Sequence, residues 1–156
     1  DRQRVRLAEL LADCMEQLQH TGASRDLRLQ VNVPPELPPI ELDKDLLRIA
    51  IDNLLTNAAK YNRQNGEIVL SAEETDERIV ISVQDSGIGI AADALPHIFD
   101  KFYRVHTGDL HDVKGFGLGL SYVKAIMTAH KGLVDVKSEP DKGSSFILTF
   151  PKRVEG

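Results

Sequence analysis

Three glycines stand at alternate positions, Gly115, Gly117 and Gly119, in the segment DVKGFGLGLSYVK (residues 112–124), directly before a helical pattern. Glycine at every second position weakens a strand or a helix, so this spacing favours a loop whose main chain something approaches closely. A phosphate group fits, because the first N–H groups of a helix are unpaired and the helix dipole is positive there. The spacing matches neither GxGxxG, since position 120 is Leu, nor GxxxxGK[ST], so alone it indicates no more than a loop able to hold an anion.

Another glycine motif, with two glycines after an acidic residue, stands in QDSGIGI (residues 84–90). Asp85 ends an apolar stretch, and the chain then turns at Gly87 and Gly89. A carboxylate at a strand end can accept a hydrogen bond from an exocyclic amine, which adenine carries and guanine replaces with a carbonyl. The alternative is an ordinary Asp-Ser-Gly turn that leaves a strand.

Four polar residues share one stripe of the longest helical pattern. Asn53, Asn57, Lys60 and Tyr61 are spaced so that, at ~100° per residue, they lie beside the apolar face. Asn is a poor residue for a helix interior, and two of them one turn apart suggest amide oxygens directed at a ligand. A solvated helix edge that tolerates Asn is the alternative.

The elements that must position these residues follow from hydrophobic periodicity. Residues 5–20 carry apolar side chains at helical spacing, beginning with Val5, and residues 27–33 alternate as a strand does. Four prolines in residues 33–40 predict a surface connection. The long helical pattern at 42–62 has Asp43 as a plausible N-cap and one apolar face, formed by Leu47, Ile51, Leu54, Leu55 and Ala58.

The rest of the chain predicts two hairpins separated by a helical region. Strands are expected at 66–74 and 78–85, and again at 132–139 and 144–151 with the turn PDKG between them. Between the hairpins we expect a turn with short helical pieces, a mobile polar loop at 104–114, and a helix from about 117 to 130. Helices and hairpins together predict a two-layer α/β sandwich.

Composition indicates one domain over residues 1–156 and limits its partners. The net charge of −5 and the absence of a basic run disfavour a nucleic-acid or anionic-membrane surface. The single cysteine, Cys14, lies in an apolar pattern and predicts a core role, without a disulfide framework or zinc site. No stretch reaches ~18 apolar residues, and the N-terminus lacks the apolar run of a secretory signal, so we expect soluble material that was excised from something larger.

The order of these motifs resembles the catalytic, ATP-binding domain of sensor histidine kinases over nearly the whole chain. NLLTNAAKYN is similar to that family's N box, DSGIGI to its G1 box, IFDKFYR to its F box, GFGLGLSYVK to its G2 box, and GSSF to the remnant of a third glycine box. The wider superfamily, with its chaperone ATPases, type II topoisomerases and mismatch-repair ATPases, shares the α/β sandwich called the Bergerat fold. The resemblance therefore implies a mixed, largely antiparallel sheet packed on about three helices, with a mobile ATP lid.

The resemblance also implies roles on the helix and at Asp85. Asn57 would bind the Mg²⁺ that bridges the phosphates, with Asn53 beside it, since amide oxygens suit a cation that keeps most of its waters. Lys60 would reach the phosphates, Tyr61 would lie near adenine, and Asp85 would accept a hydrogen bond from the adenine amine. Gly87 and Gly89 would leave room for the base.

The remaining implied roles lie in and around the lid. Gly115, Gly117 and Gly119 would hinge it and, with Leu118 and Leu120, give the phosphates N–H donors at the next helix. Arg104, with Lys101 or Lys114, would offset charge that develops on the γ-phosphoryl group.

Several aromatic and histidine residues have simpler interpretations. Phe99 and Phe102, three positions apart, are typical of core packing, and only the resemblance suggests that they dock the lid or the acceptor helices. His106 and His111 lack a third ligand and are expected to be solvated. His20 lacks the acidic neighbour of the family's phosphoacceptor motif and is expected to end a helix.

The leading functional hypothesis is a protein histidine kinase module that binds Mg-ATP. It would transfer the γ-phosphoryl group to a histidine on a separate dimerisation domain of its own homodimer, and a response regulator would act downstream. We expect a cytoplasmic domain whose full-length protein is anchored in the inner or plasma membrane through absent segments. The alternatives are an ATP-driven conformational clamp or a serine kinase, whose Glu general base is replaced here by Asn53, and a binding module that has lost turnover.

Overall fold

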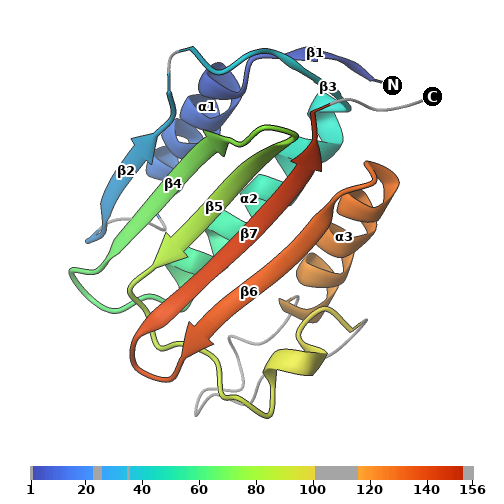
Figure 1. Cartoon of the computed structure of the whole chain (residues 1–156). Coiled ribbons are helices and arrows are strands. Elements are labelled where there is room, and N and C mark those ends of the chain that lie inside the picture. The colour runs from blue at the N-terminus through green and yellow to red at the C-terminus, as the bar shows by residue number, and fades with distance from the viewer. Residues whose placement is uncertain (1, 23–25, 35, 101–115, 153–156) are drawn as a thin grey trace.

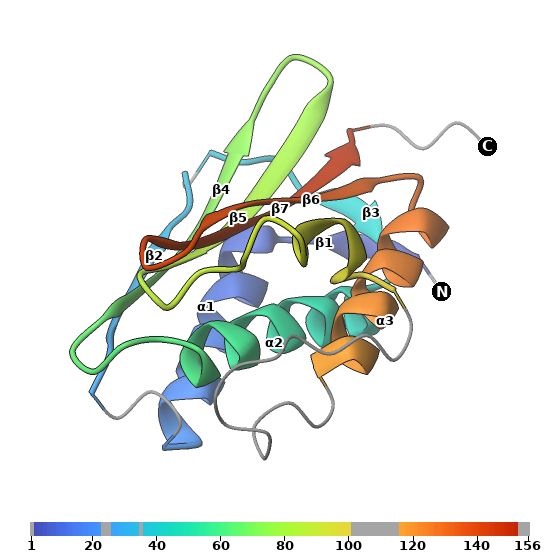
Figure 2. The same cartoon turned by 90° about the horizontal axis from the view of Figure 1, so that it is seen from below.

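The computed structural model describes residues 2–22, 26–34, 36–100 and 116–152, with the main chain alone at 116–119. Figures 1 and 2 show two layers, a sheet and the helices that cover one of its faces. The elements in chain order are β1 (Gln3–Val5), α1 (Leu7–His20), β2 (Arg28–Asn32), β3 (Ile40–Leu42), α2 (Lys44–Lys60), β4 (Glu67–Glu74), β5 (Arg78–Asp85), the 3₁₀ turn η1 (Leu95–His97), α3 (Phe116–Ala129), β6 (Leu133–Glu139) and β7 (Gly143–Pro151). The predicted two-layer α/β sandwich is confirmed.

The main sheet has the strand order β2-β4-β5-β7-β6. β2 runs parallel to β4, and the other neighbouring pairs are antiparallel. Both predicted hairpins, β4–β5 and β6–β7, are therefore confirmed. The pairing of β5 with β7 sets Asp85 opposite Ser144, so the end of β5 lies beside the turn of the second hairpin.

The N-terminal segment differs from the prediction at Val5. The apolar spacing favoured a helix from this residue, but Val5 belongs to β1 and pairs with Ile40 of β3. Ile40 itself ends the segment that was predicted to be a surface connection. Both side chains are buried, because the small β1–β3 sheet places them against the core. A three-residue strand has too few positions to show an alternating pattern of its own.

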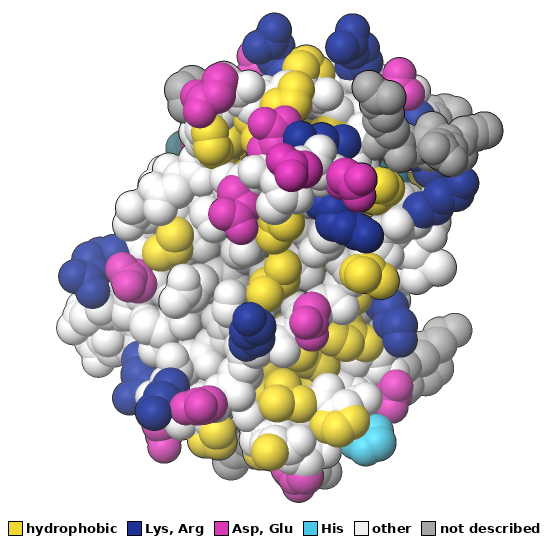
Figure 3. All heavy atoms as spheres, viewed as in Figure 1, with side chains coloured by type: hydrophobic (Ala, Val, Ile, Leu, Met, Phe, Trp, Pro, Cys, Tyr) yellow, Lys and Arg dark blue, Asp and Glu magenta, His cyan; other side chains and the backbone are white. Residues whose placement is uncertain are grey.

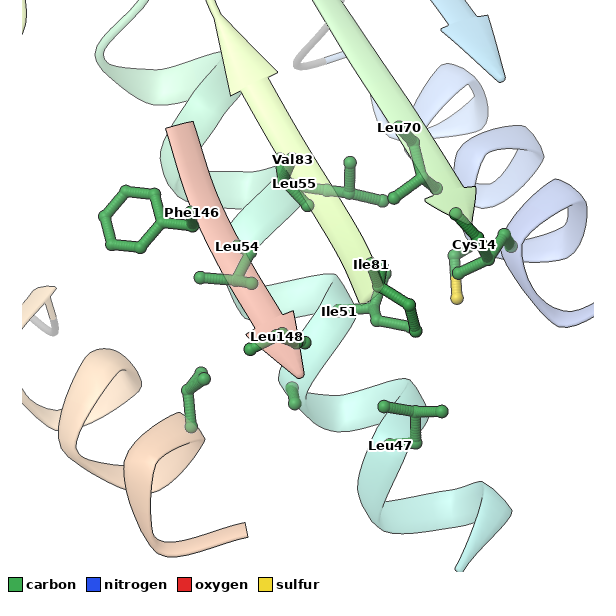
Figure 4. Close-up of a cluster of buried hydrophobic side chains, with 14 of the residues drawn as sticks. Cys14, Leu47, Ile51, Leu54, Leu55, Leu70, Ile81, Val83, Phe146 and Leu148 are labelled. Atoms are coloured by element: carbon green, nitrogen blue, oxygen red, sulfur yellow. The ribbon is translucent and has the colours of Figure 1, made fainter. Parts of the chain in front are cut away.

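Helix α2 is the central helix, and its sequence explains both its start and its packing. The carboxylate of Asp43 accepts a hydrogen bond from the N–H of Leu46 at 3.0 Å, which confirms the predicted N-cap. Figure 4 shows apolar side chains of α2, β4, β5 and β7 pointing into the space between helix and sheet. The predicted apolar face of α2 is buried as a whole: Leu47, Ile51, Leu54, Leu55 and Ala58.

The two faces of the sheet have different environments. Buried and half-buried residues alternate along β4 and β5, as expected for strands with one face on the core. The face without helices is seen in Figure 3, where charged side chains lie among scattered apolar ones. The helix-covered face therefore contains the core.

Cys14 is buried on α1, as its apolar pattern predicted. Burial raises the pKa of its thiol to about 12, and the nearby Asp52 carboxylate adds to this rise. A thiol with such a pKa stays protonated at neutral pH and is a poor nucleophile. None of the described helices is both long and apolar enough to cross a bilayer.

Candidate functional site

Asp85 is the last residue of β5, and one of its carboxylate oxygens is held by two main-chain donors. The N–H groups of Gly87 and Ser144 donate to Oδ1 over 2.8 Å and 3.3 Å. Within the described residues, no group donates to the second oxygen, Oδ2. The carboxylate is therefore fixed in orientation, while one oxygen remains able to accept a hydrogen bond from a ligand.

Burial gives this carboxylate an unusual electrostatic environment. It raises the pKa of Asp85 above its ordinary value, while the hydrogen bonds from Gly87 and Ser144 act in the opposite direction. A half-buried carboxylate with one oxygen to which no described group donates is costly for the fold alone, because part of its hydration is lost. Such groups gather at functional sites, where a ligand supplies the missing partner.

The polar stripe predicted on α2 is present at the border of its buried face. Asn53 and Asn57 are half-buried, Lys60 is exposed, and Tyr61 is the half-buried residue that caps the end of α2. The Lys60 ammonium lies 5.6 Å from the centre of the Tyr61 ring. The helical placement is therefore confirmed, while the ligand roles of these residues remain predictions.

The end of α2 and the loop after β5 are in direct contact. The N–H of Ile88 donates to the carbonyl of Tyr61 at 3.1 Å. The hydroxyl of Ser86 donates to the side-chain oxygen of Asn62 at 3.2 Å and accepts from the N–H of Glu67 at 2.8 Å. These contacts bring Tyr61 and the Asp85 loop together, while their shared contact with a base stays a prediction.

Both glycines of the Asp85 loop have a packing reason to be glycine. A Cβ atom on Gly87 would collide with the carbonyl oxygen of Tyr61, and one on Gly89 with that of Glu139. Gly89 also has a φ of +75°, which disfavours other residues. Close packing of main chain on main chain thus requires these glycines, and the prediction that they leave room for a base stays a prediction.

The second glycine segment is partly helical. Helix α3 begins at Phe116, so Gly117 and Gly119 lie in its first turns and not in a loop, which corrects the loop expected from their spacing. Leu118 is in the same turn, and the Leu120 side chain is fully buried. Gly115, Lys101, Arg104, Lys114, Phe102, His106, His111 and the predicted lid lie outside the described residues.

The simpler interpretations of Phe99 and His20 agree with their positions. Phe99 is half-buried against the core and meets the ring of Phe146 edge to face, with centroids 6.2 Å apart. His20 is the last residue of α1. Among the described residues, no cluster of three or more His, Cys, Asp or Glu side chains is arranged to hold a metal ion.

Sequence reasoning missed the contacts that join distant segments. Ser144 was quoted in the last glycine motif, but its N–H could be assigned to Asp85 only from the strand register. His130 is buried and joins α3 to the start of α2. Asn62 and Ser86 lie inside the NLLTNAAKYN and DSGIGI motifs, but no local pattern predicts the hydrogen bond that joins them.

A family model described as histidine kinase-, DNA gyrase B-, and HSP90-like ATPase matches residues 42–154. That range contains Asp85, the polar stripe of α2 and both glycine segments. The chain belongs to this ATPase family. The sensor protein RprX of Bacteroides fragilis is 41% identical over 97% of the chain, which spans 31% of the length of RprX.

Solved histidine kinase catalytic domains of the Bergerat fold share the fold of this ATPase domain. The catalytic domain of histidine kinase ThkA matches with a TM-score of 0.84 at 24% identity, over 97% of this chain and 98% of that one. Full-length ShkA in complex with AMPPNP matches with a TM-score of 0.84 at 29% identity, over 100% of this chain and 32% of that one. ThkA in complex with the response regulator TrrA matches with a TM-score of 0.79 at 22% identity, over 97% of this chain and 42% of that one.

Proposed function

We propose that this ATPase domain binds Mg-ATP and transfers the γ-phosphoryl group to a histidine on a separate dimerisation helix pair. It would thus be the kinase module of a bacterial two-component system. The observation that carries the proposal is the Asp85 carboxylate, whose Oδ1 accepts from two main-chain N–H groups, while Oδ2 receives no donor from the described residues and would accept from an exocyclic amine. Adenine has this amine. The carbonyl of Tyr61 accepts a hydrogen bond from Ile88, in the loop that follows Asp85.

Three comparisons support the nucleotide and the signalling role. ShkA was solved with AMPPNP, an ATP analogue, and aligns with the whole of this chain. RprX is named a sensor protein. The family model itself describes ATPases, so ATP is the nucleotide that the relatives favour.

The amide oxygens on α2 suit Mg²⁺, which takes further ligands from phosphates and water, better than they suit a metal whose ligands all come from the protein. Asn53 and Asn57 present amide oxygens one turn apart, and the described residues contain no cluster of acidic or sulfur ligands. Mg²⁺ keeps several waters and takes its other ligands from phosphates, so one or two amide oxygens suffice. Asn57, with Asn53 beside it, would hold the ion, which would neutralise phosphate charge when bound.

The chain's own residues would act by positioning and by charge. An imidazole nitrogen of the acceptor attacks the γ-phosphorus, the bond to the bridging oxygen breaks, and ADP leaves. Lys60 would stabilise the phosphates, with Arg104, Lys101 or Lys114 contributing charge from the segment outside the described residues. Asn53 cannot take up a proton, which disfavours hydrolysis by a general base on α2.

The proposed partners and location extend beyond this chain. We propose a homodimer formed through the dimerisation domain, a response regulator as the downstream acceptor, and anchoring in the inner or plasma membrane through other segments. The complex of ThkA with TrrA supports the response regulator.

Phosphotransfer to a separately supplied acceptor tests this function. The 156-residue chain, labelled ATP and the cognate dimerisation helix pair are mixed, and transfer is expected to rise with acceptor concentration, because no covalent link holds the acceptor nearby. The product should be acid-labile and alkali-stable, as phosphohistidine is. The chain alone should neither label itself stably nor hydrolyse ATP rapidly.

Two outcomes would contradict the kinase proposal. Acid-stable label on the chain or on a protein substrate would favour the serine kinase. Rapid ATP turnover without acceptor, abolished by Asn53→Ala, would favour the conformational clamp. A matched control is Thr56→Ala, an exposed position on the same helix, which should leave transfer unchanged.

A further inference from the structure

Arg63 links the segment after α2 to the turn between β6 and β7. Its guanidinium donates from Nη2 to the main-chain carbonyl of Asp141 at 2.8 Å and to the Asp141 carboxylate at 3.1 Å. The two residues are 78 positions apart in the chain. Arg63 therefore joins two segments that only the fold brings together.

The same turn holds the loop that follows Asp85. The N–H of Asp141 donates to the carbonyl of Ile88 at 2.7 Å, and the N–H of Ile88 donates to the carbonyl of Tyr61 at 3.1 Å. The contacts close a ring that runs through Tyr61, Arg63, Asp141 and Ile88, in which the chain itself joins Tyr61 to Arg63. Gly89, the residue after Ile88, has its main chain packed against that of Glu139.

The contact between Arg63 and Asp141 is poorly explained by stability alone. Their side chains are 47% and 88% exposed, and exposed ion pairs contribute little to the free energy of unfolding. Asp141 also has a φ of +67°, an uncommon conformation for a residue other than glycine. The guanidinium instead fixes the position of Asp141, because it binds the carbonyl and the carboxylate of this one residue at once.

We propose that Arg63 is a positioning residue for the nucleotide base. By holding Asp141, and through it Ile88, Arg63 fixes the loop that carries the Asp85 carboxylate and sets that loop against the end of α2. This inference rests on the proposed function, in which the Asp85 loop receives adenine. Arg63 itself does not contact the nucleotide in this proposal.

The test is ADP binding by the full chain and its variants, measured by calorimetry together with the thermal unfolding midpoint. Arg63→Met keeps the length of the side chain but removes its donors, and it should weaken ADP binding roughly three- to tenfold, the factor that one hydrogen bond contributes. Arg63→Lys should restore part of the affinity. Because the base end of the site is affected, the factor should be equal with Mg²⁺ and with EDTA.

Lys152→Ala provides a matched control, because Lys152 forms an ion pair with Glu74 at 3.0 Å far from Asp85. It should leave ADP affinity unchanged while shifting the unfolding midpoint about as little as Arg63→Met does. Amide exchange of Ile88 should become faster in Arg63→Met alone. Because amide exchange reports on Ile88 itself, it tests the positioning role even where Arg63→Met loses some overall stability.

The outcomes separate this inference from the proposed function. If the parent chain does not bind ADP, the proposed function fails. If the parent binds and Arg63→Met binds equally well, or if Lys152→Ala weakens binding to the same extent, the positioning role is wrong. A loss confined to Mg²⁺ conditions would also overturn it, because it would place Arg63 at the phosphates.

Discussion

The imidazole of His130 accepts a hydrogen bond through Nε2 from the main-chain N–H of Asp43, at 3.0 Å. Its other nitrogen, Nδ1, lies 2.8 Å from the carbonyl of Ile126 and donates to it. The ring is buried and meets Phe150 edge to face. A single neutral side chain therefore joins the end of α3 to the N-cap of α2, the helix that carries the polar stripe.

We expect His130→Ala to lower the free energy of unfolding by about 2–4 kcal/mol, through the cavity and the two lost hydrogen bonds. His130→Gln should lose less, because its amide oxygen can accept from Asp43. Denaturant unfolding of the three chains measures this order. Equal stability of His130→Ala and the parent would contradict the role.

Asp85→Asn should reduce the preference for adenine over guanine. The amide oxygen can keep the bonds from Gly87 and Ser144, which leaves an NH₂ donor where Oδ2 was. Binding of ATP should weaken by about 1–3 kcal/mol, while GTP, with a carbonyl at that position, should lose less. Calorimetry with both nucleotides checks this, and equal affinities in the parent would remove the assignment.

The same variant should change how stability depends on pH without any nucleotide. Burial raises the pKa of Asp85 in the folded state above the ordinary 3.8, so the folded chain binds the proton more tightly than the unfolded chain does. Burying the ionised form therefore costs stability at neutral pH, and this cost disappears as pH falls through the folded pKa toward 3.8. Asp85→Asn should be the more stable chain at pH 7, with an advantage that shrinks on acidification. An advantage that grows on acidification would contradict the sign.

Asn57→Ala should weaken the Mg²⁺-dependent part of ATP binding by about tenfold, if its amide oxygen helps to hold the ion. Binding measured in EDTA should change little, because the base contacts are untouched. Thr56→Ala, on the exposed side of the same turn, is the control. An unchanged affinity with Mg²⁺ would make the metal role of Asn57 wrong.

Gly89→Ala should destabilise the fold more than Gly22→Ala. Both glycines have positive φ, +75° and +79°, and alanine there costs about 1–2 kcal/mol. No atom of the described residues lies within 4 Å of a Cβ on Gly22, whereas a Cβ on Gly89 meets the carbonyl of Glu139, which adds about 1–3 kcal/mol. Thermal unfolding separates the two. Equal losses would mean that the loop moves aside freely.

The sequence by itself predicted the elements whose patterns are long and local. Helix α2, its Asp43 cap, its apolar face and both hairpins appear as expected, because periodicity and turn residues act over a few neighbouring positions. The motif order also pointed to the correct family. Asp85 became a candidate site residue because a carboxylate at a strand end before two glycines is visible without a structure.

Tertiary structure decided what joins distant parts of the chain. Val5 is a strand residue because Ile40 pairs with it, and three residues are too few to reveal that partner locally. The hydrogen bonds from Ser144 to Asp85 and from Arg63 to Asp141 depend on strand order and register. The packing of Gly87 and Gly89 depends on which main chain arrives opposite them. Such contacts follow from the arrangement of whole elements, which no short stretch of sequence encodes.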